Sequence, residues 1–315
     1  MGYDRNIGEG KPMRARVMIS AVFILAASVS VGFTLRYETV KTMVEPDATK
    51  RVFILLGQSN MDGYGRWLEY PDSMRLKRND ILILRNGRWV PMVPDQQYNG
   101  PEISFAHAMK KQFPDDIISI IKVSAGGAGI RAFIPDWTKE VADISEDAYH
   151  GPLYKKLKEQ IDIAKSDPGV VFCGVLWKQG EKDAIKKSYA EGYLVYLKEI
   201  ISQIRKDTGV DNLPLYIATY FDVETAERMI ENHMFEDREA ALEITAAHNR
   251  AAEEISDTYV IRHGTLPVIR DGVHFTTGGL VTLGNLYAQE VIKNYKKGKT
   301  PGDNTERTAR SGVGQ

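Results

Sequence analysis

Five apolar, β-branched runs along the middle of the chain constrain its fold more than any other feature. They read RVFILLG (51–57), IISIIKVS (117–124), GVVFCGVLW (169–177), LPLYIAT (213–219) and TYVIRH (258–263). Near-continuous apolar runs of this length are typical of strands that are covered on both faces. Helical patterns of ten or more residues lie between them, at 102–112, 152–166, 184–208, 236–256 and 276–296. This alternation predicts a three-layer α/β/α sandwich around a mainly parallel five-stranded sheet, with a hairpin-like pair (DILILRN and GRWVPM) beside it.

The other parts of the chain flank this predicted domain, which spans residues 51–297. They are a basic segment (1–16), an uncharged apolar segment (17–35), a polar linker (36–50) and a Gly/Ser/Thr-rich charged tail (298–315) that we expect to be disordered. A basic segment followed by an apolar one has the layout of an export signal, and 19 residues also suffice for a spanning helix. Residues 17–35 therefore fit either a cleaved signal peptide or a retained membrane anchor. In both cases we expect the domain to be exported, to the periplasm or the outside of the cell.

Charge and composition exclude several classes of function. The formal net charge is −1, so nothing calls for nucleic acid as a partner. The single cysteine, Cys173, excludes an intrachain disulfide and a multi-cysteine metal site. The six histidines show no H-x-x-x-H spacing, so we expect no metal site. Nothing in the sequence predicts the oligomeric state.

Polar motifs follow four of the predicted strands. They read GQSNMDG (57–63), SAGGAGIRAF (124–133), KQGEKDA (178–184) and RHGTLPVIRDGVHFTTGG (262–279). The working site of an open parallel sheet forms beyond the carboxyl ends of its strands, so these motifs should meet at one edge. Together they supply a serine, a glycine pair, an amide with a carboxylate, and an Asp-x-x-His. These are the groups that ester hydrolysis needs.

Ser59 and His274 are the candidate nucleophile and general base. Ser59 lies where a strand gives way to a helix, so its hydroxyl can project over the sheet edge. A serine at this place is also typical of a helix N-cap. Asp271 can reach back through the Gly272 turn to one nitrogen of His274 and fix its tautomer. A capping histidine on a surface loop is the alternative for this motif.

Three further residues are candidates to stabilise the oxyanion. Gly126 and Gly127 allow close approach of the backbone, so an N–H of this pair can point at the oxyanion, although a plain tight turn also needs such a pair. Gln179 offers a side-chain amide to the same oxyanion. Glu181 is within reach of His274 in principle, but KQGEKDA also reads as an exposed polar helix start.

In their order and spacing, five segments together resemble the SGNH hydrolase superfamily, and within it the carbohydrate esterase family 6 and sialate O-acetylesterase branch. The segments are FILLGQSNMDG, NGPEISFAHAM, VSAGGAGI, GVLWKQGEKDA and RDGVHFTTGG, and the resemblance runs from about 51 to 292. It implies a flavodoxin-like α/β/α fold and no cofactor. It also implies removal of acetyl groups from sugars, such as acetyl-xylan or acetylated sialic acid, through an acyl-enzyme intermediate.

The resemblance also assigns roles to the site residues. It makes Ser59 the nucleophile and His274 the base. Ser59, Gly126, Gly127 and Gln179 would form the oxyanion hole. Asp271 corresponds to the acid of the DxxH motif, and Glu181 matches a glutamate that has also been considered the orienting acid. Local geometry favours Asp271.

The sequence departs from the family pattern at Lys178, where relatives carry a histidine. This departure leaves a catalytically impaired carbohydrate-binding relative as the alternative function. Weaker expectations for contacts to the sugar fall on Asn60, Arg131, Trp137 and Lys178. Tyr64 and Trp177 are further aromatic candidates for stacking on a sugar face, although Trp177 at a strand end also suits the core.

Overall fold

The computed structural model describes residues 39–40, 48–96, 98–219, 227, 230–231, 236 and 238–296. Segments 1–16, 17–35 and 298–315 and most of the linker 36–50 lie outside these residues, so what the sequence predicts for them stays a prediction. Among the described helices, none is both long enough and apolar enough to cross a membrane.

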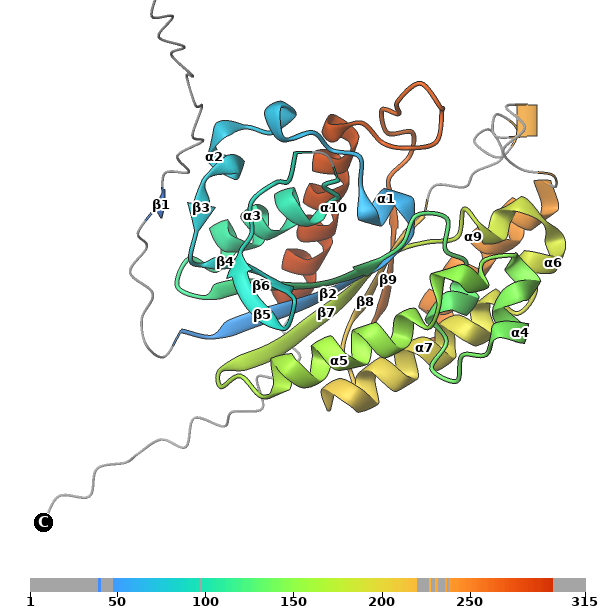
Figure 1. Ribbon diagram of the computed structural model, residues 1–315, viewed down its shortest axis with the longest axis horizontal. Coiled ribbons are helices and arrows are strands. Elements are labelled where there is room, and N and C mark those ends of the chain that lie inside the picture. The colour runs from blue at the N-terminus through green and yellow to red at the C-terminus, as the bar shows by residue number, and fades with distance from the viewer. Residues whose placement is uncertain are drawn as a thin grey trace, which may run out of the picture. The chain divides into compact units, whose positions relative to one another are not determined.

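A seven-stranded sheet forms the centre of the domain, in the order β5-β4-β6-β2-β7-β8-β9 (Figure 1). Its strands are β2 (Lys50–Gly57), β4 (Ile81–Arg85), β5 (Arg88–Pro91), β6 (Ile117–Ser124), β7 (Val170–Lys178), β8 (Leu215–Thr219) and β9 (Thr258–Arg262). All neighbours are parallel except β4 and β5. The five predicted strands are confirmed. The sheet has seven because β4 of the predicted hairpin pairs with β6. A separate two-stranded sheet joins β1 (Thr39–Val40) to β3 (Lys77–Arg78).

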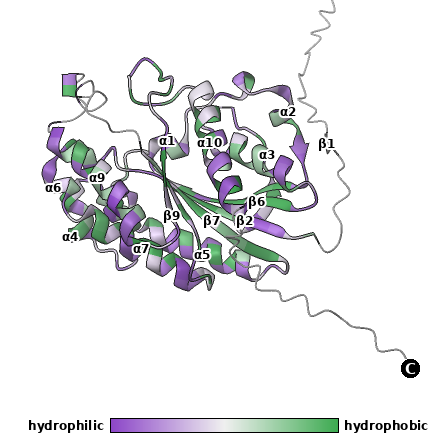
Figure 2. Ribbon diagram, turned by 180° about the vertical axis from the view of Figure 1, so that it is seen from behind, coloured by the Kyte–Doolittle hydropathy of each residue, from purple (hydrophilic) through white to green (hydrophobic). Residues whose placement is uncertain are grey.

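Helices cover both faces of the sheet, which confirms the predicted α/β/α class. One layer holds α3 (Glu102–Gln112) and α10 (Thr277–Lys296), and the other holds α5 (Leu153–Lys165), α7 (Tyr193–Thr208) and α9 (Arg238–Glu254) (Figure 1). Side chains of β2 alternate between the layers: Val52, Ile54 and Leu56 pack toward the second layer, Phe53 and Leu55 toward the first. In Figure 2 the strands are mostly hydrophobic and the helices carry hydrophilic outer surfaces.

Short helices occupy the connections. They are α1 (Ser59–Asp62), α2 (Asp72–Arg75), α4 (Lys139–Ala142) and α6 (Lys187–Ala190), with 3₁₀ turns at Trp67–Glu69, Ile130–Phe133, Asp143–Ser145, Ala148–His150 and Asp183–Ile185. The prediction of one helix over 184–208 is wrong. Gly192 takes a φ of +79°, a left-handed conformation that separates α6 from α7.

Candidate active site

Ser59 lies at the carboxyl end of the central strand β2, as the first residue of α1. The chain turns there through Gly57, whose φ of +157° is rarely adopted by other residues. A Cβ at Gly57 would lie 2.0 Å from the carbonyl oxygen of Lys178, so the ends of β2 and β7 approach this closely only with glycine. The N–H of Gln58 then donates to that carbonyl at 3.1 Å. Ser59 is held by this turn with 5% of its surface exposed.

His274 and Asp271 lie on the loop that precedes α10. The imidazole Nδ1 is 2.6 Å from Asp271 Oδ2, and Asp271 Oδ1 accepts from the N–H groups of Val273 and His274, both at 2.9 Å. Gly272, with a φ of +75°, makes the turn that brings the carboxylate back. Burial raises the pKa of Asp271, but the hydrogen bonds from His274 and the backbone outweigh it and hold this pKa below its ordinary value. The carboxylate can thus keep a proton on Nδ1 and leave Nε2 as the acceptor.

Ser59 and His274 line one open pocket of about 350 Å³. The lining consists of Gln58, Ser59, Tyr64, Gly126, Gly127, Glu181, Lys182, Ile185, Val273 and His274. The ring of Tyr64 lies against the imidazole of His274, with 4.3 Å between their centroids. No hydrogen bond joins Ser59 to His274 within the described residues, and in ligand-free enzymes such bonds often form only with substrate.

The glycine loop lies beside Ser59 in this pocket. A Cβ at Gly126 would be 4.0 Å from the Cβ of Ser59, and Gly127 has a φ of +77°. None of the hydrogen bonds among the described residues uses the N–H groups of Ser59, Gly126 or Gly127. These three groups are therefore available as donors to an anionic oxygen.

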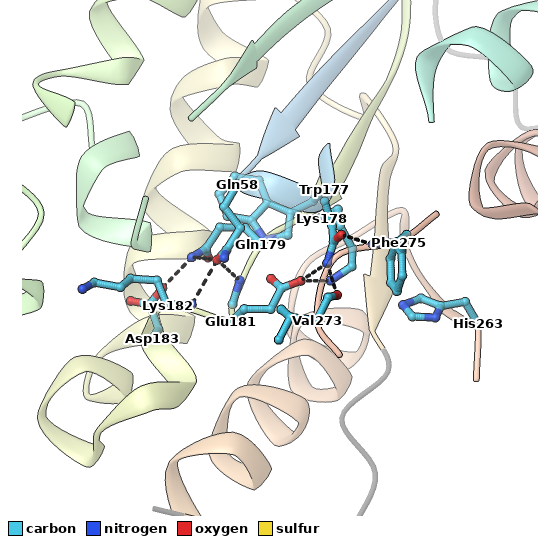
Figure 3. A network of polar contacts seen from close by, with 12 residues as sticks. Gln58, Trp177, Lys178, Gln179, Glu181, Lys182, Asp183, His263, Val273 and Phe275 are labelled. Carbon is cyan, nitrogen blue, oxygen red and sulfur yellow. Dashed lines mark hydrogen bonds and ion pairs between the residues drawn. The ribbon is translucent and has the colours of Figure 1, made fainter. Parts of the chain in front are cut away.

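A buried ion pair between Lys178 and Glu181 lies beside the pocket (Figure 3). Lys178 Nζ lies 2.5 Å from Glu181 Oε1, with side-chain exposures of 1% and 5%. Asn60, the residue after Ser59, donates to the same Glu181 oxygen at 3.1 Å and to the carbonyl of Val273 at 3.2 Å. The side-chain oxygen Oδ1 of Asn60 accepts from the N–H of Phe275 at 3.0 Å. Asn60 thus binds the backbone on both sides of His274.

The charges of this pair stabilise each other. Burial would raise the pKa of Glu181, but Lys178 outweighs it and lowers this pKa. Burial lowers the pKa of Lys178, and Glu181 opposes the effect. The contact that reaches His274 Nδ1 comes from Asp271, while Glu181 accepts from Lys178 and Asn60.

A family model described as carbohydrate esterase, sialic acid-specific acetylesterase matches residues 49–293. The chain belongs to this family of carbohydrate esterases. A probable carbohydrate esterase of Arabidopsis thaliana is 25% identical over an alignment of 273 residues that covers 79% of this chain and 93% of the plant protein. Membership supports a hydrolase that acts on acetyl esters and implies an acetylated carbohydrate as substrate.

Solved structures share the fold of this esterase. The Arabidopsis protein superposes with a TM-score of 0.61 at 21% identity, over 78% of this chain and 98% of its own. The protein NanS gives 0.58 at 15% identity, over 79% and 98%. A carbohydrate acetylesterase from Xanthomonas citri gives 0.55 at 16% identity, over 79% and 56%. At such identities the likeness shows the fold alone.

The expected role of Gln179 as an oxyanion donor does not fit the geometry of this esterase. Its Nε2 donates to Asp183 Oδ2 at 2.5 Å and to Gln58 Oε1 at 3.2 Å (Figure 3). It also lies 3.1 Å from the carbonyl of Ala128, a third acceptor. Its side chain is 1% exposed and is not part of the pocket lining. Because the amide has two hydrogens for three internal acceptors, it has none to offer a substrate.

The four expected sugar contacts also differ from the prediction. Arg131 is 2% exposed and donates to the carbonyls of Tyr189 at 2.6 Å and Glu191 at 2.7 Å, so it stabilises the fold instead of meeting solvent. Asn60 and Lys178 are each 1% exposed and bonded internally. The half-buried Trp137 packs against the core away from the pocket lining.

Trp177, the further aromatic candidate, is also a core residue. Its side chain is fully buried and its ring N–H donates to Tyr193. Tyr64 alone among the aromatic candidates reaches the pocket.

Sequence reasoning missed two buried polar roles near the pocket. The bridging role of Asn60 depends on Val273 and Phe275, more than 200 positions away, and no local signal points to it. Asp183 belongs to KQGEKDA, which also read as an exposed polar helix start. It is instead fully buried, and burial raises its pKa to about 7 despite its bonds to Gln179 and the N–H of Ile130. Among the described residues, no group of three or more His, Cys, Asp or Glu could hold a metal ion.

Proposed function

We propose that this protein is a serine O-acetylesterase that removes acetyl groups from carbohydrate hydroxyls through an acyl-enzyme intermediate. The observation that supports it most is the 2.6 Å contact of Asp271 with His274 Nδ1, in a pocket that Ser59 also lines. A serine, an oriented imidazole and free backbone N–H donors in one pocket form the set that acyl transfer needs.

The proposed reaction has two halves. Ser59 Oγ attacks the acetyl carbonyl while His274 Nε2 takes its proton, and the oxyanion accepts from the N–H groups of Ser59, Gly126 and Gly127. The imidazolium then protonates the departing sugar oxygen, which leaves as a hydroxyl, and an acetyl ester remains on Ser59. Water, deprotonated by His274, attacks this ester, and the imidazolium returns the proton to Ser59 Oγ as acetate leaves.

The alternative of a catalytically impaired relative rested on Lys178. Its ammonium is 1% exposed and paired with Glu181, so the cation does not project into the pocket beside Ser59. The geometry thus gives no reason for lost chemistry at this position.

The test compares wild type with Ser59→Ala for acetate release from p-nitrophenyl acetate, acetyl-xylan and acetylated sialic acid. Ser73→Ala, at an exposed serine of α2, is the matched control. We expect Ser59→Ala to lose at least about 10³-fold in kcat and to escape labelling by a fluorophosphonate, whereas Ser73→Ala behaves as wild type. Full activity in Ser59→Ala would refute the assignment.

We also propose that the protein is exported, on the basis of the basic and apolar segments 1–16 and 17–35. N-terminal sequencing of protein from fractionated cells separates the two forms. A start after residue 26 would mean a cleaved signal, and an intact segment in the membrane fraction would mean an anchor. Recovery of intact protein only in the cytosol would contradict export.

A further inference from the structure

A second pocket adjoins the catalytic one. Tyr64, Arg66, Gln96, Tyr98 and Ile269 line it, and its volume is about 380 Å³. Tyr64 lines both pockets, so the two share a wall, and that wall also packs on His274. A ligand in the second pocket would therefore contact Tyr64, the residue whose ring lies against the imidazole of His274.

Exposed tyrosines gather around this region. Among the described residues the exposed tyrosines are Tyr64 (39%), Tyr98 (63%) and Tyr149 (77%). Tyr64 and Tyr98 form an edge-on pair with 6.3 Å between centroids. The hydroxyl of Tyr149 lies 3.9 Å from where a Cβ of Gly127 would be, which places it beside the glycine loop of the catalytic pocket. Exposed apolar side chains that gather in one place often mark a ligand-binding site.

Hydrogen bonds hold the walls of the second pocket in place. The N–H of Gly65 donates to the backbone carbonyl of Asn99 at 3.0 Å, and the side-chain amide of Asn99 donates to the carbonyl of Gly65 at 2.8 Å. This bridge fixes the segment of Tyr64 against that of Tyr98. On the other wall, the N–H of Ile269 donates to the carbonyl of His274 at 2.8 Å. The pocket is thus built onto the loop that carries the catalytic base.

The chemistry of the lining suits a sugar ring. A pyranose has C–H faces that pack on aromatic rings and hydroxyls around its rim that need donors and acceptors. Tyr64 and Tyr98 supply the faces, while the Arg66 guanidinium and the Gln96 amide supply polar partners. Each of the two pockets lies at the small end of the range for ligand sites, about 300–1,000 Å³, which suits one sugar unit apiece.

We propose that the second pocket binds the sugar unit next to the acetylated one, so that the enzyme prefers acetylated oligosaccharides or polysaccharides to acetylated monosaccharides. This inference rests on the proposed function. The inference adds to the proposed function the length of the substrate and the residues that bind its second sugar unit. Tyr98 is a binding residue in this account and takes no part in the chemistry.

The test measures acetate release from acetylated xylo-, manno- and sialyl-oligosaccharides, each beside its acetylated monosaccharide, and from p-nitrophenyl acetate. Tyr98→Ala is the test variant, and Tyr98→Phe keeps the ring. Val195→Ala, at an exposed residue of α7, is the distant control. We expect Tyr98→Ala to raise KM for the best oligosaccharide about 3- to 10-fold while kcat stays unchanged. Its kinetics on the monosaccharide and on p-nitrophenyl acetate should match wild type, as should both control variants throughout.

Two results would overturn the inference: equal kcat/KM of wild type on every oligosaccharide and its monosaccharide, or unchanged oligosaccharide kinetics in Tyr98→Ala. Failure of the proposed function looks different, because wild type and Ser59→Ala would then release acetate equally or not at all. In that event, calorimetric titration of Ser59→Ala with the same oligosaccharides, with and without Tyr98→Ala, still decides the inference. Weaker binding on loss of Tyr98 supports it, and equal or undetectable binding refutes it.

Discussion

The buried pair of Lys178 and Glu181 makes the sharpest prediction about stability. Its side chains are 1% and 5% exposed and 2.5 Å apart. Glu181→Gln keeps an oxygen that can accept from Asn60 but removes the charge opposite Lys178. Removing one partner of a buried ion pair typically costs about 3–5 kcal/mol, because the other charge stays in a poorly solvated place. We expect the free energy of unfolding at pH 7 to fall by about this amount.

The loss should depend on pH. Burial already lowers the pKa of Lys178 below its ordinary 10.5, and without the carboxylate it falls further. The folded variant then binds fewer protons than the unfolded chain at pH values between these two pKa values. Its free energy of unfolding should therefore rise with pH in that window, relative to wild type.

Urea denaturation of a double-mutant cycle measures the coupling. The cycle consists of Glu181→Gln, Lys178→Met and both together. We expect the double variant to be more stable than the two single losses predict, by at least about 2 kcal/mol, since it has no buried charge at these positions. Lys293→Met, which breaks a surface pair with Glu290, is the control and should hardly change stability. Additive single losses would refute this account of the pair.

Three further predictions concern other positions. Asp271→Asn should lower kcat on p-nitrophenyl acetate by roughly 10²–10⁴-fold, because His274 loses the carboxylate that orients it. Circular dichroism should show that the fold is intact. A kcat equal to that of wild type would contradict this prediction. Because burial raises the pKa of Asp183 to about 7, the folded protein keeps a proton that the unfolded chain releases above its ordinary pKa of 3.8. The free energy of unfolding should fall as pH rises between these values, and Asp183→Asn should flatten that slope by at most about 1.4 kcal/mol per pH unit in urea titrations; an unchanged slope would be evidence against the buried proton. Gly57→Ala should cost more than about 2 kcal/mol in thermal denaturation, because its Cβ would meet the carbonyl of Lys178 at 2.0 Å; an unchanged Tm would show that the turn relaxes.

Elements whose signals are local could be predicted well from the sequence. The five parallel strands follow from continuous apolar runs, and α3 spans the predicted 102–112. The contact between Asp271 and His274 spans three residues and one glycine turn, so spacing alone suggested it. The prediction of one helix over 184–208 was wrong because the amphipathic pattern runs through Gly192. The left-handed conformation of Gly192 separates α6 from α7.

Side-chain roles at the site were harder to predict where partners are distant. Gln179 and Arg131 follow strands in the sequence, as substrate-binding residues often do, yet both are buried. The amide of Gln179 donates hydrogen bonds to Asp183 and to the carbonyl of Ala128. The guanidinium of Arg131 donates to the carbonyls of Tyr189 and Glu191. A buried donor binds the nearest acceptors, and sequence position does not reveal which those are.

The sequence by itself therefore determined the layers of the fold and the sheet edge at which the candidate site residues lie. Both follow from properties of short segments, namely the periodicity of strands and helices and the positions at which parallel strands end. The tertiary structure alone decided which polar groups at that edge stay free. In the folded protein Lys178 is buried against Glu181, and Asn60 connects the turn of Ser59 to the loop of His274. Tyr64 and Tyr98 remain exposed beside the pocket. Those outcomes depend on which distant groups pack together, since a polar side chain is available to a substrate only when no internal partner has satisfied it.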